Sequence, residues 1–429
     1  RRLIEMPVFV GAGTSSFMKS SGGVGFSRVS TSTRNGLTAV EGQVIYNTDN
    51  NVLEYYDGSN WAKVSSVLAV LNSVSGNIID GLGSTLTLSG TGFLTANLVV
   101  NFLQSADSIN VNVTVTPSSD TAATVSVPAS VYNNVTAGRV VIIKVTNSDG
   151  SQSTGVNKTA VGLPSGGSIN TYSGYRSHKF TSSGTWTNTF VTSADVLIVA
   201  GGGGGGADNS GGGGAGGMLV QTGVSVSAQG YTITVGAGGN GSGISHGDGG
   251  PYATNGADSA ALGYTAVGGG RGGSAGGANA NSGGSGGGGS GESANSTGGA
   301  GTSGQGNSGG NHVNSGGGGG GGKGAAGQNG NVRGSQRGGN GGTGGANSYE
   351  TGSNQNYAAG GGGGNENGQY DAQSPASGIG GVTNSSVNNR ATSGTNGTGA
   401  GGGASTHTSN PNPSGGDGGD GVVVIRYAV

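Results

Sequence analysis

Glycine is distributed very unevenly along this chain, and that asymmetry limits what the chain can fold into. Of 104 glycines in 429 residues, 21 lie in residues 1–200 and 83 in residues 201–429. The second half contains recurrent glycine blocks, at 201–206, 211–217, 236–241, 268–277, 283–291, 316–322, 360–364 and 399–403. Two interpretations fit such blocks: a flexible linker, or an ordered packing of main chain against main chain.

The ordered interpretation needs a physical reason, because glycine loses more entropy on folding than any other residue. Polyproline-II strands have no internal hydrogen bonds and rise about 3.1 Å per residue. Glycine strands of this kind lack Cβ atoms, so they can lie side by side and bond through the N–H and C=O groups of their neighbours. The intervening segments would form loops at the two ends of a stiff slab. A linker as long as residues 201–421 would also be unusual in a β-rich chain, which favours order.

The rest of the sequence predicts an all-β, modular fold with essentially no helix. Apolar residues alternate, or form runs of four or five bounded by Gly, Asn, Asp and Ser, as in strands and turns. We expect a small N-terminal β-meander for attachment or oligomerisation at 1–65, a β-sandwich at 66–162, a linker with framing strands at 163–200, a polyglycine-II-like glycine-rich domain at 201–421 and a closing strand at 422–429. The wholly apolar runs 196–199 and 422–425 are expected to share a sheet that clamps both ends of the glycine-rich domain.

The N-terminal part has little material for a core of its own. Two predicted strands, at 43–46 and 52–56, are joined by a polar turn. Two or three short strands do not make an independently stable domain. Other copies of the chain are the simplest cover for the aromatic side chains of this part, Tyr46, Tyr55, Tyr56 and Trp61.

Several segments resemble known families. GSTLTLSGTGF (83–93) and VVIIKVTNSDGSQS (140–153), with Pro128 between them, resemble the IPT/TIG class of Ig-like domain, which implies a spacer. HKFTSSGTWTNTFVTSADVLIVAGGGGGG (178–206) and GGDGGDGVVVIRYAV (415–429) resemble the framework of glycine-rich phage tail proteins. The glycine-rich domain is similar to the polyglycine-II sandwich of the fibre-tip adhesins of T-even-like phages. These resemblances imply a bacteriophage fibre or appendage protein, and the likeness to phage fibres implies a homotrimer.

Composition argues against several other classes of protein. The net charge is −2 and Lys and Arg form no run, so we expect no nucleic-acid partner. Cysteine is absent, which excludes a disulfide scaffold, a zinc knuckle and a thiol nucleophile. No apolar stretch approaches the roughly 20 residues of a membrane-spanning helix, so we expect no membrane insertion.

Two glycine motifs and four histidines have to be tested as possible nucleotide-binding, metal-binding or catalytic sites. Residues 196–206 fit a strand followed by G-x-G-x-x-G, but ADNSGGGGAGG follows where a dinucleotide-binding fold needs a helix. Residues 317–323 begin like a P-loop, but Gly324 stands where Ser or Thr is required. The histidines are His178, His246, His312 and His407. Their spacing supports no zinc site, and no Ser-His-Asp set or carboxylate pair can be argued from the sequence. A metal ion bound by three copies of one histidine on a trimer axis remains an alternative. We therefore expect no cofactor and no enzymatic activity.

The larger polar residues that interrupt the glycine blocks are the candidate receptor contacts. Tyrosine combines stacking area with a polar tip at low entropic cost, as in other binding loops, although each one could instead pack against the glycine slab. The candidates are Tyr252, Tyr264, Tyr349, Tyr357, Tyr370, His246, Arg271, Arg333 and Arg337.

The sequence thus predicts a structural and adhesive fibre subunit of the phage virion. It would bind other virion proteins through its N-terminal part, and a host glycan or outer-membrane protein through its glycine-rich tip. One alternative is a head fibre, capsid decoration or neck appendage with no receptor role. Another is a self-assembling filament protein of a cell surface, and an enzyme acting on envelope polysaccharide has the least support.

Overall fold

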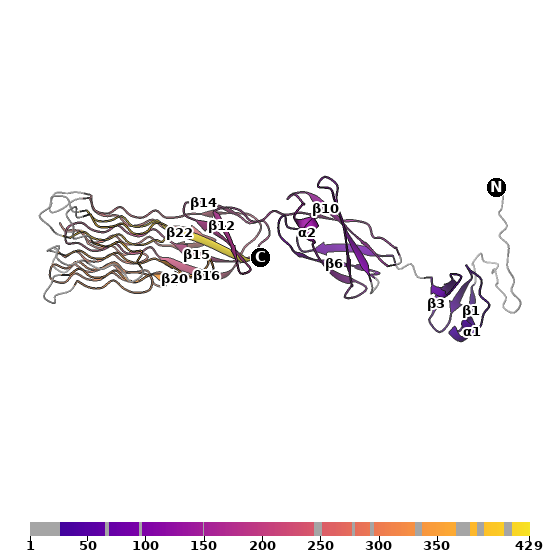
Figure 1. The fold of residues 1–429 in the computed structure, drawn as a ribbon. Coiled ribbons are helices and arrows are strands. Elements are labelled where there is room, and N and C mark those ends of the chain that lie inside the picture. Colours follow the sequence, from indigo (N-terminus) through magenta and orange to yellow (C-terminus); the bar gives the residue numbers. More distant parts are fainter. Residues whose placement is uncertain are drawn as a thin grey trace. The chain divides into compact units, whose positions relative to one another are not determined.

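A computed structural model of the chain describes residues 26–64, 68–93, 97–148, 150–243, 251–276, 279–291, 296–330, 337–365, 378–383, 390–406 and 414–429. The chain separates into two compact units, residues 1–162 and 163–429. Within the described ranges the regular structure is nearly all β, with two helices of five and four residues (Figure 1). The predicted all-β, modular fold is confirmed. Neither helix is long and apolar enough to cross a membrane.

The first unit contains a four-stranded sheet with the order β1-β2-β3-β4. Its elements are β1 (Ser27–Val29), α1 (Thr31–Asn35), β2 (Val44–Asn47), β3 (Val52–Tyr56) and β4 (Trp61–Lys63). Strands β1 and β2 are parallel, and the other pairs are antiparallel. Helix α1 begins after Ser30, whose side chain accepts a hydrogen bond from the N–H of Thr33 at 3.2 Å, as N-cap residues do.

A β-sandwich forms the rest of the first unit. One sheet has the order β5-β6-β9 and the other β11-β10-β7-β8. The elements are β5 (Val70–Ser75), β6 (Thr85–Thr91), β7 (Leu98–Gln104), β8 (Ile109–Val115), β9 (Ala122–Ser126), α2 (Ala129–Tyr132), β10 (Val140–Thr146) and β11 (Val156–Thr159). Alternate side chains such as Leu86, Leu88 and Phe102 point into one shared core. The relationship to Ig-like domains stays a prediction, because it depends on sequence motifs alone.

The second unit is organised by a five-stranded sheet with the order β12-β13-β22-β15-β16. Its strands are β12 (Ser168–Tyr172), β13 (Tyr175–Phe180), β15 (Ser193–Val199), β16 (Met218–Ser225) and β22 (Val422–Ala428). Strands β15 and β22 are antiparallel neighbours, with Val196 opposite Ile425 and Val199 opposite Val422. The chain enters the glycine-rich region from β15 and returns in β22 (Figure 1). The prediction that the two apolar runs share a sheet is confirmed.

Both faces of this strand pair are buried. Val196 and Ile198 point into a core that contains Trp186, whereas Leu197 and Val199 point into a second core on the opposite face. This double burial explains why the two strands are apolar throughout instead of alternating. Three two-stranded ribbons flank the sheet: β14 (Gly184–Thr187) with β17 (Gly230–Ile233), β18 (Ser259–Ala261) with β19 (Tyr264–Ala266), and β20 (Gly345–Asn347) with β21 (Gln355–Tyr357).

The hydrogen bonds of residues 201–206 define how the glycine-rich segments pack. Every third N–H group donates to the same neighbouring segment, at N···O distances of 2.8–3.0 Å, and the acceptor segments are 254–257, 416–419 and 211–214. The carbonyl groups accept hydrogen bonds with the same three-residue period, from the N–H groups of segments 239–242, 269–272 and 402–405. Three residues per turn with no internal hydrogen bond describes a polyproline-II strand, and here six different segments surround it.

The same arrangement recurs in other glycine segments, which we call together the glycine array. Residues 211–217 and 317–322 also rotate their N–H groups among three neighbours. Figure 1 shows these segments running side by side beyond the ends of β15 and β22. The glycine-rich region is therefore ordered across its described residues, as the polyglycine-II interpretation predicted.

Glycine is required in the array because neighbouring strands are too close for a side chain. A Cβ atom placed on Gly203 would lie less than 3.0 Å from backbone atoms of Gly269 and Gly270. Gly213 and Gly320 meet neighbouring backbone in the same way. The composition of the second half is thus a steric requirement of the packing.

Short polar side chains complete the hydrogen bonding at the rim of the array. The carboxylate of Asp420 accepts a hydrogen bond from the N–H of Gly238 at 2.9 Å, and that of Asp417 accepts one from Gly241 at 2.7 Å. The two aspartates are three residues apart, which matches the three residues per turn of the strand. These carboxylates replace the carbonyl of a further strand, so the rim does not present those N–H groups for edge-to-edge association.

A buried histidine makes the stability of the second unit depend on pH. His178 is fully buried, its Nδ1 lies 2.7 Å from the carbonyl oxygen of Gly166, and its Nε2 lies 3.3 Å from the hydroxyl of Tyr427. Burial lowers the pKa of the imidazole from its usual 6.5, the bond to Gly166 opposes this, and Arg176 lowers the pKa further. Burial therefore favours the neutral ring in the folded state.

We expect the second unit to lose stability as the pH falls below about 6.5. The unfolded chain takes up a proton near the ordinary pKa of 6.5, whereas the folded chain does not until a lower pH. Thermal unfolding at pH 7.5 and pH 5 should show a lower Tm in acid, and His178→Phe should reduce this difference because it removes the titrating group. An equal loss of Tm in wild type and His178→Phe would show that other groups cause the acid sensitivity.

Candidate functional site

The glycine array has two ends of different character. At one end its strands continue into the five-stranded sheet, and at the other residues 207–210 turn the segment 201–206 back into 211–217. We call the second of these the turn end. The turn is fixed by polar contacts: the N–H of Asp208 donates to the hydroxyl of Ser405 at 2.8 Å, and the hydroxyl of Ser210 donates to the carbonyl of Asp208 at 2.7 Å.

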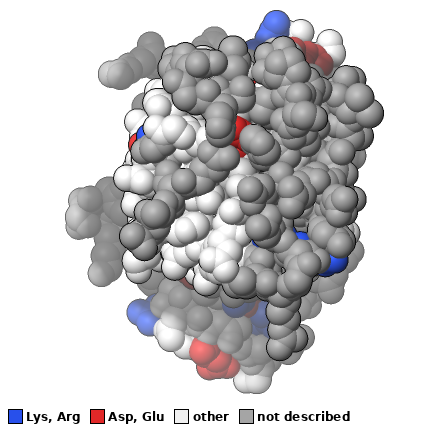
Figure 2. Space-filling model, turned by 90° about the vertical axis from the view of Figure 1, so that its left-hand side faces the viewer, with Lys and Arg blue, Asp and Glu red and all other residues white. Residues whose placement is uncertain are grey.

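Residues at the ends of five other segments lie beside this turn. Their backbone hydrogen bonds show it, and the pairs are Ser242 with Gly205, Ala275 with Ala207, Gly291 with Asn209, Gly364 with Ser210, and Ser405 with Gly206. The glycine segments therefore run back and forth between the two ends, as the sequence predicted. Figure 2 views the protein from this side, and the described residues visible between those drawn in grey are mostly uncharged.

One aromatic and polar cluster lies on the array close to the turn end. Tyr252 is 45 % exposed, and the guanidinium carbon of Arg271 lies 5.7 Å from the centre of its ring. The side-chain oxygen of Asn255 accepts hydrogen bonds from the backbone N–H of Arg271 at 3.0 Å and from the amide of Asn281 at 3.1 Å. We call these four residues the Tyr252 cluster. The N–H of Gly204 bonds the carbonyl of Thr254, which places the cluster about one strand turn from residues 207–210.

The Tyr252 cluster combines chemical features that recognise polar ligands. A tyrosine ring offers a flat stacking surface, and a guanidinium group against that ring adds directional donors. Asn255 is exposed, and Arg271 and Asn281 are half-buried, so their side chains are held by the array while remaining accessible. The structure brings together Tyr252 and Arg271 from the predicted candidates and adds the two asparagines.

The other predicted candidates lie elsewhere. Tyr264 begins β19 at the sheet end and is 37 % exposed. Tyr349 and Tyr357 are 7 % and 2 % exposed and belong to the core beneath Leu197 and Val199, which leaves little of either ring for a ligand. Arg337 is exposed, and its backbone lies beside Gly316. His246, Arg333 and Tyr370 lie outside the described residues.

Tyr349 and Tyr357 help to attach the β20–β21 ribbon to the sheet. The carboxylate of Glu350 contacts the ammonium of Lys179 at 2.7 Å and accepts a hydrogen bond from the hydroxyl of Tyr357 at 2.9 Å. Burial, and then the bond to Glu350, raise the pKa of Tyr357. The guanidinium of Arg426 contacts the ring of Tyr349, with its carbon 3.8 Å from the ring centre. Lys179 and Arg426 are far from Glu350 and Tyr349 in sequence, so no local motif could have revealed these two contacts.

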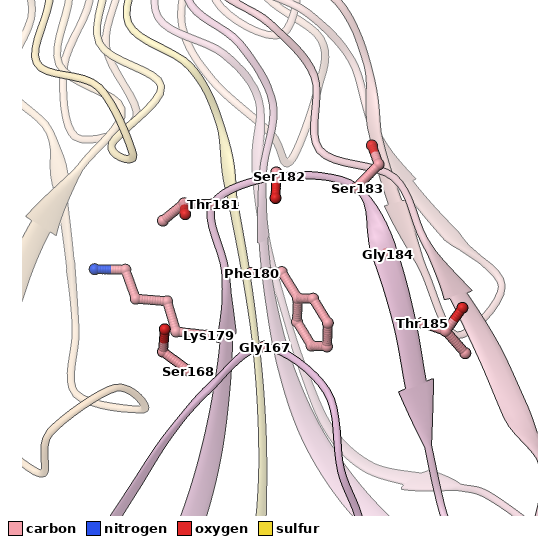
Figure 3. Close-up of a pocket in the computed structure, with 9 residues that line it drawn as sticks. All are labelled: Gly167, Ser168, Lys179, Phe180, Thr181, Ser182, Ser183, Gly184 and Thr185. Carbon is pink, nitrogen blue, oxygen red and sulfur yellow. The ribbon is translucent and has the colours of Figure 1, made fainter.

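A small open hollow lies beside the turn between β13 and β14. It has a volume of about 230 Å³ and is lined by residues 167–168 and 179–185. Figure 3 shows Ser168, Lys179 and Thr181 on one side of the backbone and the ring of Phe180 on the other. The ammonium group of Lys179 is already paired with the carboxylate of Glu350, so it is not available to bind an anionic ligand in this hollow. Across the described ranges no three His, Asp or Glu side chains are close enough to hold a metal ion.

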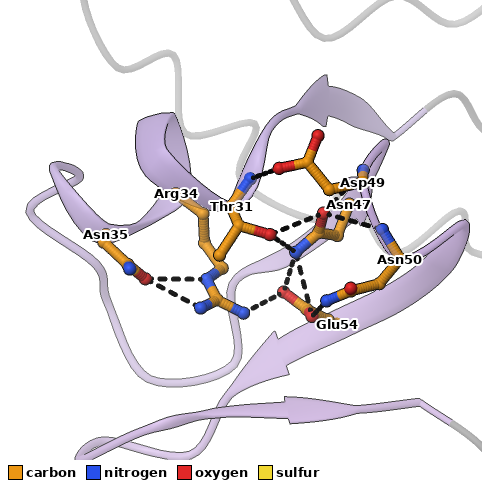
Figure 4. Close-up of polar contacts among 7 residues, drawn as sticks. All are labelled: Thr31, Arg34, Asn35, Asn47, Asp49, Asn50 and Glu54. Atoms are coloured by element: carbon orange, nitrogen blue, oxygen red, sulfur yellow. Dashed lines mark hydrogen bonds and ion pairs between the residues drawn. The ribbon is translucent and has the colours of Figure 1, made fainter.

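The N-terminal sheet is the other surface of interest, because it lacks a core. Four of its described residues are buried, and two of these are polar: Val29, Ile45, Asn47 and Glu54. Glu54 pairs with Arg34 at 2.7 Å and accepts hydrogen bonds from Asn47 at 3.1 Å (Figure 4). Desolvation raises the pKa of the Glu54 carboxyl, but the hydrogen bonds from Arg34, Asn47 and Asn50 outweigh it and leave that pKa lowered.

The fold thus defines a modular β-protein in which a sheet clamps an array of polyglycine-II strands. Residues 180–428 match the family described as a glycine-rich domain, and the chain belongs to that family. The match begins at the last residue of β13 and ends with β22, so it covers the array together with β15, β16 and β22 of the sheet.

Residues 14–78 match a second family, described as a phage tail like trimerisation region. This match includes all four strands of the N-terminal sheet. It indicates a structural protein of a phage tail or fibre, and hence a component of the virion, and it supports a homotrimer. A search of curated proteins found no match.

Proposed function

We propose that this chain is a non-enzymatic fibre subunit whose glycine array presents the Tyr252 cluster to a polar ligand on the host surface, a cell-envelope glycan. The observation that carries the proposal is an exposed tyrosine backed by a guanidinium group on an ordered array close to its turn end. The hydrogen-bonded strands hold the cluster in place, so binding would cost little conformational entropy. In a trimer three copies would act together, so a weak single contact could give firm attachment.

The other parts of the chain fit the same proposal. The first unit would connect the array to other virion proteins, and the phage tail-like match in residues 14–78 supports a place in a tail or fibre. The capping of rim N–H groups by Asp417 and Asp420 disfavours lateral growth into a filament. No cofactor is needed for this role.

Binding to arrayed bacterial envelope polysaccharides tests the role of the cluster. We expect the full chain to bind a subset of these glycans, and Tyr252→Ala to weaken binding by roughly tenfold, as expected for truncation of an aromatic contact. Tyr264→Ala is the matched control, because Tyr264 is similarly exposed but lies at the sheet end. Unchanged binding by Tyr252→Ala, or an equal loss in the control, would contradict the proposal. Release of free sugar by the wild-type chain would indicate an enzyme instead.

A further inference from the structure

The N-terminal sheet has one closed face and one open face. Successive residues of a strand point to opposite faces, and the strand register assigns each side chain to one of them. Ile45 lies opposite Glu54, so these two share a face with Val29 and Asn47, and all four are buried. Helix α1 covers these four residues: Thr31 bonds Asn47 and Arg34 pairs with Glu54, so the polar network of Figure 4 satisfies the buried carboxylate.

The opposite, open face has a different composition. Tyr46 lies opposite Arg28 and Leu53, and Tyr55 lies opposite Val44 and Ala62. The open face therefore consists of Arg28, Val44, Tyr46, Leu53, Tyr55 and Ala62. None of these six residues is buried within the chain, and Tyr55 is 39 % exposed. The guanidinium carbon of Arg28 lies 5.0 Å from the centre of the Tyr46 ring.

We propose that this open face is the surface through which three copies of the chain contact one another. The occupant follows from the match of residues 14–78 to a trimerisation region, which spans the whole sheet. A sheet this small cannot bury enough apolar surface alone, and α1 of the same chain already occupies part of the closed face, through Arg34 on Glu54. Tyr46 and Tyr55 lie on the two central strands and Arg28 on the edge strand β1, and tyrosine and arginine are enriched among energetically dominant interface contacts.

The charges of the sheet fit the same assignment. The buried carboxylate of Glu54 is neutralised by Arg34 of the same chain, so this charge needs no partner from another chain. On the open face Arg28 is the charged residue, and its position over Tyr46 lets it stack while it enters an interface. The self-association surface therefore lies on the side of the sheet opposite α1.

The absence of cysteine allows a clean test in the full chain. Tyr55→Cys places a thiol on the open face, and Val40→Cys places one at a residue that is 69 % exposed in the loop between α1 and β2. In preparations of trimeric mass, we expect maleimide to label the open-face thiol on the order of tenfold more slowly than the loop thiol, because interface cores are packed like protein interiors. The labelling rate of the open-face thiol should rise when dilution yields monomers.

A charge substitution provides a second, independent measurement. Tyr55→Glu should shift the mass of the full chain from trimer towards monomer, whereas Val40→Glu should leave the trimer intact. Equal labelling of both thiols in the trimer would overturn the assignment. So would protection of the open-face thiol that persists in the monomer, because the cover would then come from the same chain. These readouts do not involve glycan binding, so they succeed or fail independently of the proposed host contact.

Discussion

Gly203→Ala should destabilise the second unit by more than about 3 kcal/mol, beyond the usual cost of overpacking. The added methyl group would lie less than 3.0 Å from backbone atoms of Gly269 and Gly270, and backbone cannot rotate away as a side chain can. Separating these two strands would also stretch the hydrogen bonds that join them, from Gly269 to Gly201 and from Gly272 to Gly204. In a unit of this size the corresponding fall in Tm is on the order of 10 °C.

Thermal unfolding and amide hydrogen exchange of the glycine segments would measure this effect. Gly184→Ala is the matched control, because the nearest atoms to its new methyl group would be ring carbons of Phe180 at 3.7 and 3.8 Å. We expect that control to cost less than about 1 kcal/mol. If Gly203→Ala unfolds at the wild-type temperature, the strands must be more loosely packed than the structure shows.

Val423→Asp should prevent the second unit from folding. Val423 is fully buried in β22, opposite Phe180 on one side and Ile198 on the other. An unpaired carboxylate at this position would cost several kcal/mol, which is a large share of the roughly 5–15 kcal/mol that usually stabilises a domain. Because β22 is the strand to which the array returns, we expect the glycine segments to lose their order together with the sheet.

Fluorescence of Trp186 and exchange of the glycine amides would follow the sheet and the array separately. Trp186 is fully buried in the same core as Val423 and is the one tryptophan of the second unit. Ala428→Asp introduces the same charge at an exposed position of the same strand and should leave both signals unchanged. Slow exchange of the glycine amides in Val423→Asp would mean that the array is stable without its clamp.

The sequence was sufficient to predict the framing strands and the kind of packing between them. Runs 196–199 and 422–425 are apolar without alternation, and such strands need cover on both faces. The glycine blocks predicted polyproline-II packing because only backbone is available to form contacts. Predicted strands such as 43–46 and 52–56 agree with β2 and β3 to within one residue.

The order of neighbours within the array could not be predicted. Glycine segments have no side chains to specify a partner, so nothing local shows that 201–206 lies beside 254–257 and 416–419. The rim did carry a usable signal, since aspartates at 417 and 420 repeat at the period of the strand. That spacing would have predicted both the strand type and the face that points outwards.

The candidate site was only partly predictable for a similar reason. Exposed Tyr252 and buried Tyr349 both follow glycine-rich sequence and differ only in their tertiary contacts. Tyr349 is covered because Glu350 pairs with Lys179 and Arg426 lies against its ring, and both partners come from distant strands. Asn255 and Asn281 joined the cluster through hydrogen bonds that spacing alone does not reveal.

The rotation of hydrogen bonds by one neighbour per residue restricts how related chains can differ in length. Deleting a single glycine from 201–206 would turn every later N–H group towards the wrong segment, whereas deleting three would restore each pairing and shorten the strand by roughly 9 Å. Natural variants should therefore gain or lose residues inside the glycine segments in multiples of three. The turns that connect the glycine segments lie outside these strand-to-strand hydrogen bonds, so their length is not restricted to multiples of three. The same array can therefore have turns of any size.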